Sequence, residues 1–86
     1  MTNKKSNRER ITWILYELDE AKEHLESLIK ELSENEVISD EEFRIYMGHI
    51  YAHLNRAWNS RNQEKGISDE NWEIMSKFPS DLEPVG

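Results

Sequence analysis

A seven-residue repeat of apolar side chains runs without interruption from Ile11 to Leu32. Its two interleaved series are Ile11, Leu18, Leu25 and Leu32, and Ile14, Ala21 and Leu28. Apolar residues that alternate three and four positions apart form a stripe along one side of an α-helix. Because no glycine or proline falls within residues 6–34, the repeat predicts one long helix over about 7–33. Ser6 and Glu9 have the spacing of a capping box at its start.

A second helix is predicted over about residues 40–62, after a short polar break. Ser39 and Glu42 again have capping-box spacing, and apolar residues from Phe43 onward recur at helical intervals. A connection this short makes the two helices antiparallel neighbours. The sequence therefore predicts a long antiparallel helical hairpin.

The rest of the chain predicts a short C-terminal helix over about residues 69–77. Ser68 supplies a third capping signal, and Pro79 ends the helical pattern. We expect one all-α domain spanning residues 1–86, because a chain of 86 residues has room for a single core. Residues 1–5 and 80–86 are expected to be flexible tails.

Side-chain size and the distribution of charge both support the pairing of the two predicted helices. The predicted register places Leu25 beside Ile50 and Leu18 beside the small Ala57, so that large and small side chains alternate across the interface. Residues 11–42 hold eleven acidic residues and two lysines, whereas residues 43–65 hold four basic residues and one acid. We therefore expect attraction between the two helices.

Composition excludes several classes of function. The chain has no cysteine, so it has neither a disulfide framework nor a thiolate metal site, and no apolar run reaches the ~18 residues of a membrane span. A net charge of -7 disfavours nucleic acid as a partner, despite a basic cluster at Lys4, Lys5, Arg8 and Arg10. A cytoplasmic location, with no membrane association and no cofactor, is the expectation.

Apolar residues outside the hairpin stripe predict self-association. Trp13, Leu15 and Ile29 widen the stripe of the first helix, and Tyr51 and Trp58 do the same for the second. Two helices cover only one side of each other, so we expect two hairpins to form a dimeric four-helix bundle. A three-helix monomer, in which the third helix covers these residues, is the competing arrangement.

The densest polar segment lies near the end of the second predicted helix. A partner-binding patch would use Arg56, Trp58, Asn59, Arg61 and Asn62, because Arg and Trp are frequent anchors of interfaces. The structural alternative pairs the arginines with glutamates of the first helix and gives Trp58 a packing role. A related interpretation is small-molecule binding between Trp58, Trp72 and the arginines.

A metal site is the alternative function. His49 and His53 are one helical turn apart, and the predicted register brings His24 and Glu20 to the same level of the hairpin. The chain lacks a Glu-x-x-His motif, so solvent-exposed histidines are the simpler interpretation.

No catalytic set is complete in this sequence. Glu17, Glu20 and Glu23 have the three-residue spacing that some magnesium-dependent helical hydrolases use, but the second helix offers no matching acidic pair beyond its start. We expect these glutamates on a solvated face. The sequence thus predicts a small, acidic, non-enzymatic interaction or regulatory module that is homo-oligomeric, with an unidentified protein as a further partner.

Overall fold

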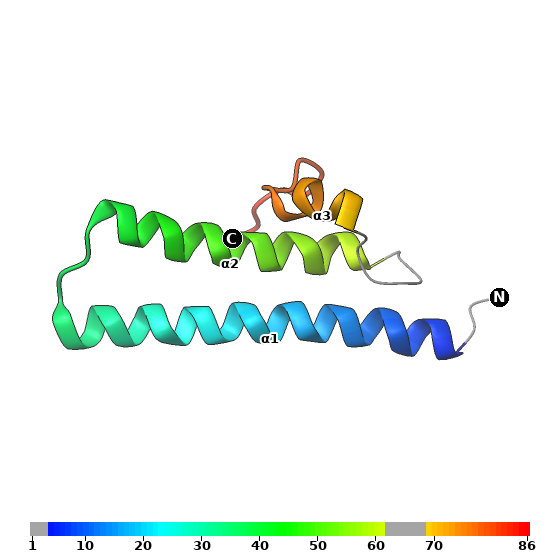
Figure 1. Cartoon of the computed structure of the whole chain (residues 1–86), viewed down its shortest axis with the longest axis horizontal. Coiled ribbons are helices and arrows are strands. Elements are labelled where there is room, and N and C mark those ends of the chain that lie inside the picture. Colours follow the sequence, from blue (N-terminus) through cyan, green and yellow to red (C-terminus); the bar gives the residue numbers. More distant parts are fainter. Residues whose placement is uncertain (1–3, 62–68) are drawn as a thin grey trace.

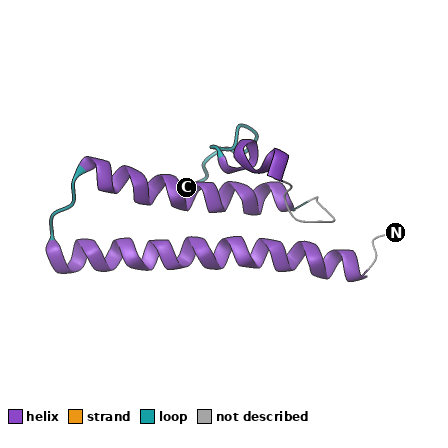
Figure 2. Cartoon of the chain, viewed as in Figure 1, coloured by secondary structure: helices purple, strands orange, loops and turns teal. Residues whose placement is uncertain are grey.

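Three helices make up the regular structure in the computed structural model, which describes residues 4–61 and 69–86. They are α1 (Lys4–Asn35), α2 (Asp40–Ser60) and α3 (Asp69–Ser76), and no strand occurs in these two described ranges (Figure 1; Figure 2). The predicted all-α hairpin with a short third helix is therefore confirmed.

The start of α1 differs from the prediction. The helix begins at Lys4, so Ser6 lies inside it and is not the N-cap. It also takes in the end of the segment expected to be a tail. The lysines before Ser6 are good helix formers, and no helix-breaking residue separates them from it, so the helix extends through them.

The start of α2 agrees with the prediction. Ser39 is the N-cap, and its Oγ accepts a hydrogen bond of 3.1 Å from the backbone N–H of Glu42. Asp40, Glu41 and Glu42 in the first turn add negative charge where the helix dipole favours it. The third predicted cap, Ser68, lies outside the described residues.

The turn between α1 and α2 starts with a left-handed residue. Glu36 has a φ of 55°, and its backbone N–H donates to the carbonyl of Leu32 at 3.0 Å. This is the geometry of a helix C-terminus that ends in the left-handed region, where glycine is the preferred residue. The turn reverses the chain and sets α2 antiparallel to α1.

The three helices form an open arrangement in which α2 lies between α1 and α3 (Figure 1). In the described part of the chain, α3 packs against α2, and its backbone does not come close to that of α1. The third helix therefore leaves most of α1 uncovered. None of the described helices is long and apolar enough to cross a membrane.

The apolar core is small and differs in part from the predicted pairing. Its buried members are Ala21, Leu28, Ile50 and Ala57. Leu18 and Leu25, which were expected to face α2, are 43% and 41% exposed. The hairpin instead turns a neighbouring line of α1 toward α2, a line that includes Glu17.

Candidate functional site

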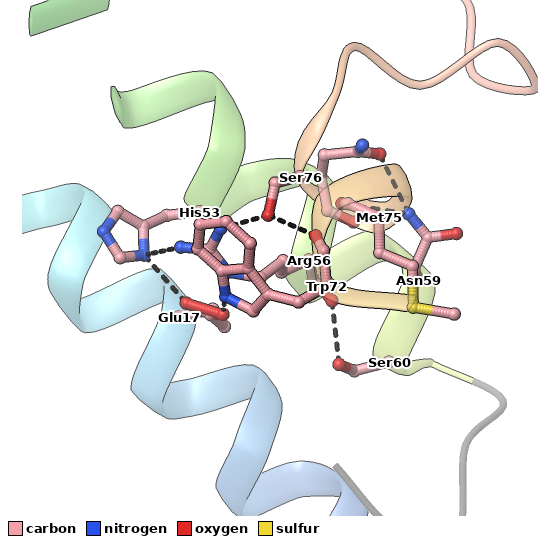
Figure 3. Close-up of polar contacts among 9 residues, drawn as sticks. Glu17, His53, Arg56, Asn59, Ser60, Trp72, Met75 and Ser76 are labelled. Carbon is pink, nitrogen blue, oxygen red and sulfur yellow. Dashed lines mark hydrogen bonds and ion pairs between the residues drawn. The ribbon is translucent and has the colours of Figure 1, made fainter. Parts of the chain in front are cut away.

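A buried polar cluster joins α1 to α2. Glu17 and Arg56 are each 6% exposed, and His53 is 7% exposed. The Oε2 atom of Glu17 accepts a hydrogen bond of 2.6 Å from Arg56 Nε, and its Oε1 atom lies 2.7 Å from His53 Nδ1 (Figure 3). The expectation that Glu17 lies on a solvated face was wrong, because its carboxylate has two buried partners on α2.

The contact between His53 and Glu17 defines the tautomer of the imidazole. His53 Nδ1 lies 2.7 Å from the carboxylate and 3.0 Å from Arg56 Nη2. A lone pair on Nδ1 would face a negatively charged oxygen at the shorter distance, which is repulsive, whereas an N–H there donates a charge-assisted hydrogen bond. We therefore assign a proton to Nδ1, so that Nε2 is the ring nitrogen that takes no part in the contact with Glu17.

Arg56 extends the polar cluster to α3. Its Nη1 donates to the Oγ of Ser76, and its guanidinium lies 4.8 Å from the centre of the Trp72 ring. Ser76 Oγ in turn donates to the carbonyl of Trp72 at 2.7 Å. One buried side chain thus holds all three helices together, which explains how so short a third helix keeps its place.

The three histidines of the chain lie together beside this cluster. The ring centroids of His24 and His49 are 4.3 Å apart. The centroid of His53 lies 5.2 Å from that of His24 and 5.6 Å from that of His49. All three rings are stacked within 25° of parallel. The predicted register, which brought His24 to the level of His49 and His53, is confirmed in this respect.

The surroundings of His49 disfavour its protonated form. Desolvation by its neighbours lowers the pKa of His49 below the ordinary value of 6.5. Nearby groups that carry or acquire positive charge add to this lowering, namely His24, His53 and Arg56. Glu20 acts in the opposite direction, which places its carboxylate near His49.

A cavity of about 350 Å³ adjoins the polar cluster and opens to solvent. Its walls combine aromatic rings with polar side chains: Trp13, Tyr16, Glu17, His49, His53, Arg56, Ser60 and Trp72. Arg56 faces this cavity, but its charge is already neutralised by Glu17. The cavity brings Trp72 and Arg56 together as the small-molecule interpretation expected, whereas Trp58 lies elsewhere.

The predicted partner-binding segment makes its contacts largely within the chain. Trp58 Nε1 donates to Asp81 at 2.9 Å, and Arg61 stacks on the Trp58 ring at 3.6 Å. Asn59 donates to the backbone carbonyl and side chain of Asn55 on the preceding turn. These contacts, together with those of Arg56, give the segment a structural role.

Two details of that segment differ from the expected structural role. Arg61 pairs with Asp81 at 3.5 Å rather than with a glutamate of α1. Asn62 lies outside the described residues. Because Trp58 of α2 and the C-cap residue Arg61 both contact Asp81, the segment expected to be a C-terminal tail is partly attached to the hairpin. Partner binding by the segment stays a prediction.

Comparison with known proteins assigns no family. No protein-family profile, curated protein or solved structure matches the chain.

An uncovered apolar stripe on α1 is the second notable surface. It consists of five residues that we call the outer stripe: Ile11, Leu15, Leu18, Leu25 and Ile29. They are 41–60% exposed, and they follow the alternating four- and three-residue spacing of a coiled-coil seam, with Lys22 at the one polar position. At 3.6 residues per turn the five positions lie within about 40° of one line along the helix.

Proposed function

We propose that the protein is a non-enzymatic, self-associating interaction module in which the outer stripe of α1 packs against a second copy of the chain. The outer stripe is the observation that carries this proposal. Scattered apolar residues are normal on a protein surface, but five in one line at coiled-coil spacing, interrupted only by Lys22, are typical of a helix that has a partner.

A second copy fits the outer stripe because the stripe is symmetric about its own centre. Antiparallel pairing around a two-fold axis near Glu20 brings Ile11 opposite the partner's Ile29, and Leu15 opposite the partner's Leu25. Lys22 then lies opposite the partner's Leu18. Its aliphatic stem covers that leucine while its ammonium group reaches the partner's Asp19. A single polar residue in such a seam favours one register over the others.

The arrangement of the helices leaves room for this pairing. Since α3 packs on the side of α2 away from α1, it does not compete for the outer stripe. Two hairpins that pair through α1 form the four-helix bundle expected from the sequence. A cytoplasmic location and regulation of an unidentified protein partner belong to the same proposal.

A pair of matched variants tests the proposal. Leu15→Lys with Ile29→Lys places two charges on the outer stripe, at side chains that are 59% and 60% exposed. The control, Ile45→Lys with Ile74→Lys, adds the same charge at side chains that are 62% and 69% exposed but lie on α2 and α3. Light scattering after size-exclusion chromatography then gives the mass of each variant.

We expect the control to remain a dimer and the stripe variant to become a monomer. Each of the four leucine and isoleucine side chains removed from the dimer contributes about 1 kcal/mol, so the dissociation constant should rise more than about 100-fold. Equal masses for the two variants, whether both dimeric or both monomeric, would refute the assignment of the interface to the outer stripe. Circular dichroism confirms that both variants keep their helices.

A further inference from the structure

All three histidines of the chain converge at one level of the hairpin. His24 comes from α1, and His49 and His53 come from α2, yet each offers a nitrogen atom that lies within 4.8 Å of the other two. The chain has no other histidine. The neutral imidazole is a common ligand of divalent metal ions, and three of them at one level of a hairpin can reach a single ion.

The spacing of these nitrogens is close to that of a zinc site. Nitrogen ligands at about 2.0–2.1 Å from a tetrahedral zinc ion lie about 3.4 Å from one another. The nitrogens of the cluster, at up to 4.8 Å, therefore need to close by roughly 1.4 Å at most. A shift of this size is within the reach of side-chain rotation and requires no movement of the helices.

Two of the three rings are free to make that rotation. His24 is half-buried and His49 is exposed, and the terminal torsion of a histidine side chain has a broad energy well. The rings now stack nearly parallel, so His24 and His49 must turn for their lone pairs to point at a common ion. His53 is buried, so its ring stays in place while the rings of His24 and His49 rotate about their own side-chain torsions.

His53 is already oriented as a metal ligand. Its Nδ1–H donates to Glu17 at 2.7 Å, and its other ring nitrogen lies on the opposite side of the ring, away from Glu17 and Arg56 (Figure 3). A carboxylate that accepts the second N–H of a ligating histidine is a recurrent feature of metal sites, because it fixes the tautomer and makes the ligand more basic.

We propose that His24, His49 and His53 bind a divalent transition-metal ion of the zinc type, with Glu17 as the positioning residue behind His53. The exposed side of His49 leaves the fourth ligand position to solvent. Since the ligands come from both long helices, the bound ion fastens α1 to α2. The site is independent of self-association, because none of these residues belongs to the outer stripe.

The test titrates zinc into protein that carries no affinity tag and has been freed of metal with a chelator that is then removed. We expect isothermal calorimetry to give one zinc ion per chain, and zinc to raise the unfolding temperature. Cobalt(II) in place of zinc should give the absorption bands of a tetrahedral ion. The absence of saturable zinc binding would overturn the proposal.

Single substitutions distinguish this site from a simple pair of histidines on α2. His24→Gln should weaken zinc binding by at least about tenfold and reduce the thermal shift at a fixed zinc concentration, because it removes the ligand from α1. If His24→Gln binds zinc as tightly as the unchanged protein, the three-histidine site is refuted. His24 is only half-buried, and circular dichroism of the variant checks that its helices are retained.

The role of Glu17 has a separate readout. Glu17→Gln keeps all three ligands but replaces the carboxylate, and we expect it to weaken zinc binding by about 10- to 100-fold. Glu26→Gln, at an exposed position of the same helix, is the matched control and should leave zinc affinity unchanged. Equal affinities for these two variants would remove Glu17 from the site, provided that circular dichroism shows both to be folded.

Discussion

The hairpin contains a buried ion pair between Glu17 and Arg56. Removal of one partner should destabilise the hairpin strongly, because the other charge is then buried alone. Each residue is 6% exposed, and the two side chains meet at 2.6 Å. In Glu17→Leu, the guanidinium of Arg56 remains buried without its counter-charge. Removal of one partner from a buried pair costs about 3–5 kcal/mol. For a small domain this is a large share of the total free energy of unfolding.

Removal of both partners should cost much less. In the double variant Glu17→Leu with Arg56→Met, no charge remains buried, and apolar side chains of similar length fill the space. We expect the double variant to regain most of the free energy of unfolding that Glu17→Leu loses. The contacts of Arg56 with Ser76 and Trp72 are still lost, so recovery should be incomplete and the separation of α3 from α2 should become easier.

Guanidinium denaturation followed by far-ultraviolet circular dichroism measures these differences, with a chelator present and at one protein concentration. Glu26→Leu is the control, since its partner Lys22 lies 4.0 Å away and both side chains are about two-thirds exposed. Its effect should be below about 0.5 kcal/mol. The reasoning would be refuted if Glu17→Leu lost as little free energy of unfolding as Glu26→Leu. It would also be refuted if the double variant lost as much as Glu17→Leu and Arg56→Met together, each measured as a single substitution.

Three further predictions concern pH, the start of α2 and the turn. Because the folded state lowers the pKa of His49, the unfolded chain takes up the proton first as pH falls below about 6.5. The free energy of unfolding, measured with a chelator, should therefore fall between pH 7.5 and pH 5.5, and fall less in His49→Gln; equal slopes would contradict this. Ser39→Ala removes the N-cap and should cost about 1 kcal/mol in urea denaturation, with an unchanged midpoint as the contrary result. Glu36→Gly should raise the free energy of unfolding by up to about 1 kcal/mol, because glycine adopts the left-handed conformation without strain; a lower unfolding temperature would argue against it.

The helices of this protein were predictable because their signals are local. The cap at Ser39 and the unbroken apolar spacing of α1 lie within a few residues of the elements that they define. The start of α1 was missed because the signal at Ser6 competes with helix-forming residues before it, and only the balance of the two decides where the helix begins.

The side of α1 that faces α2 was less predictable. The sequence puts Leu18 and Leu25 in one wide apolar stripe with other residues, and the predicted register turned these two leucines toward α2. The structure buries the line with Glu17 instead, since the carboxylate finds Arg56 and His53, which lie 39 and 36 residues along the chain. An acidic residue carries no local sign of such distant partners. Leu18 and Leu25, which were predicted to face α2, are instead part of the exposed outer stripe.

The candidate metal site was also predictable only in part. Helical spacing and hairpin register were enough to place His24 level with His49 and His53. The orientation of His53 by Glu17 depends on the contact between α1 and α2, so it became visible only with the structure.

Sedimentation equilibrium of the unaltered protein over a dilution series tests self-association most directly. The chain has a mass of 10.3 kDa. The account predicts twice this mass at micromolar concentration, with a return to the monomer mass on dilution. A mass of 10.3 kDa at every concentration would contradict it.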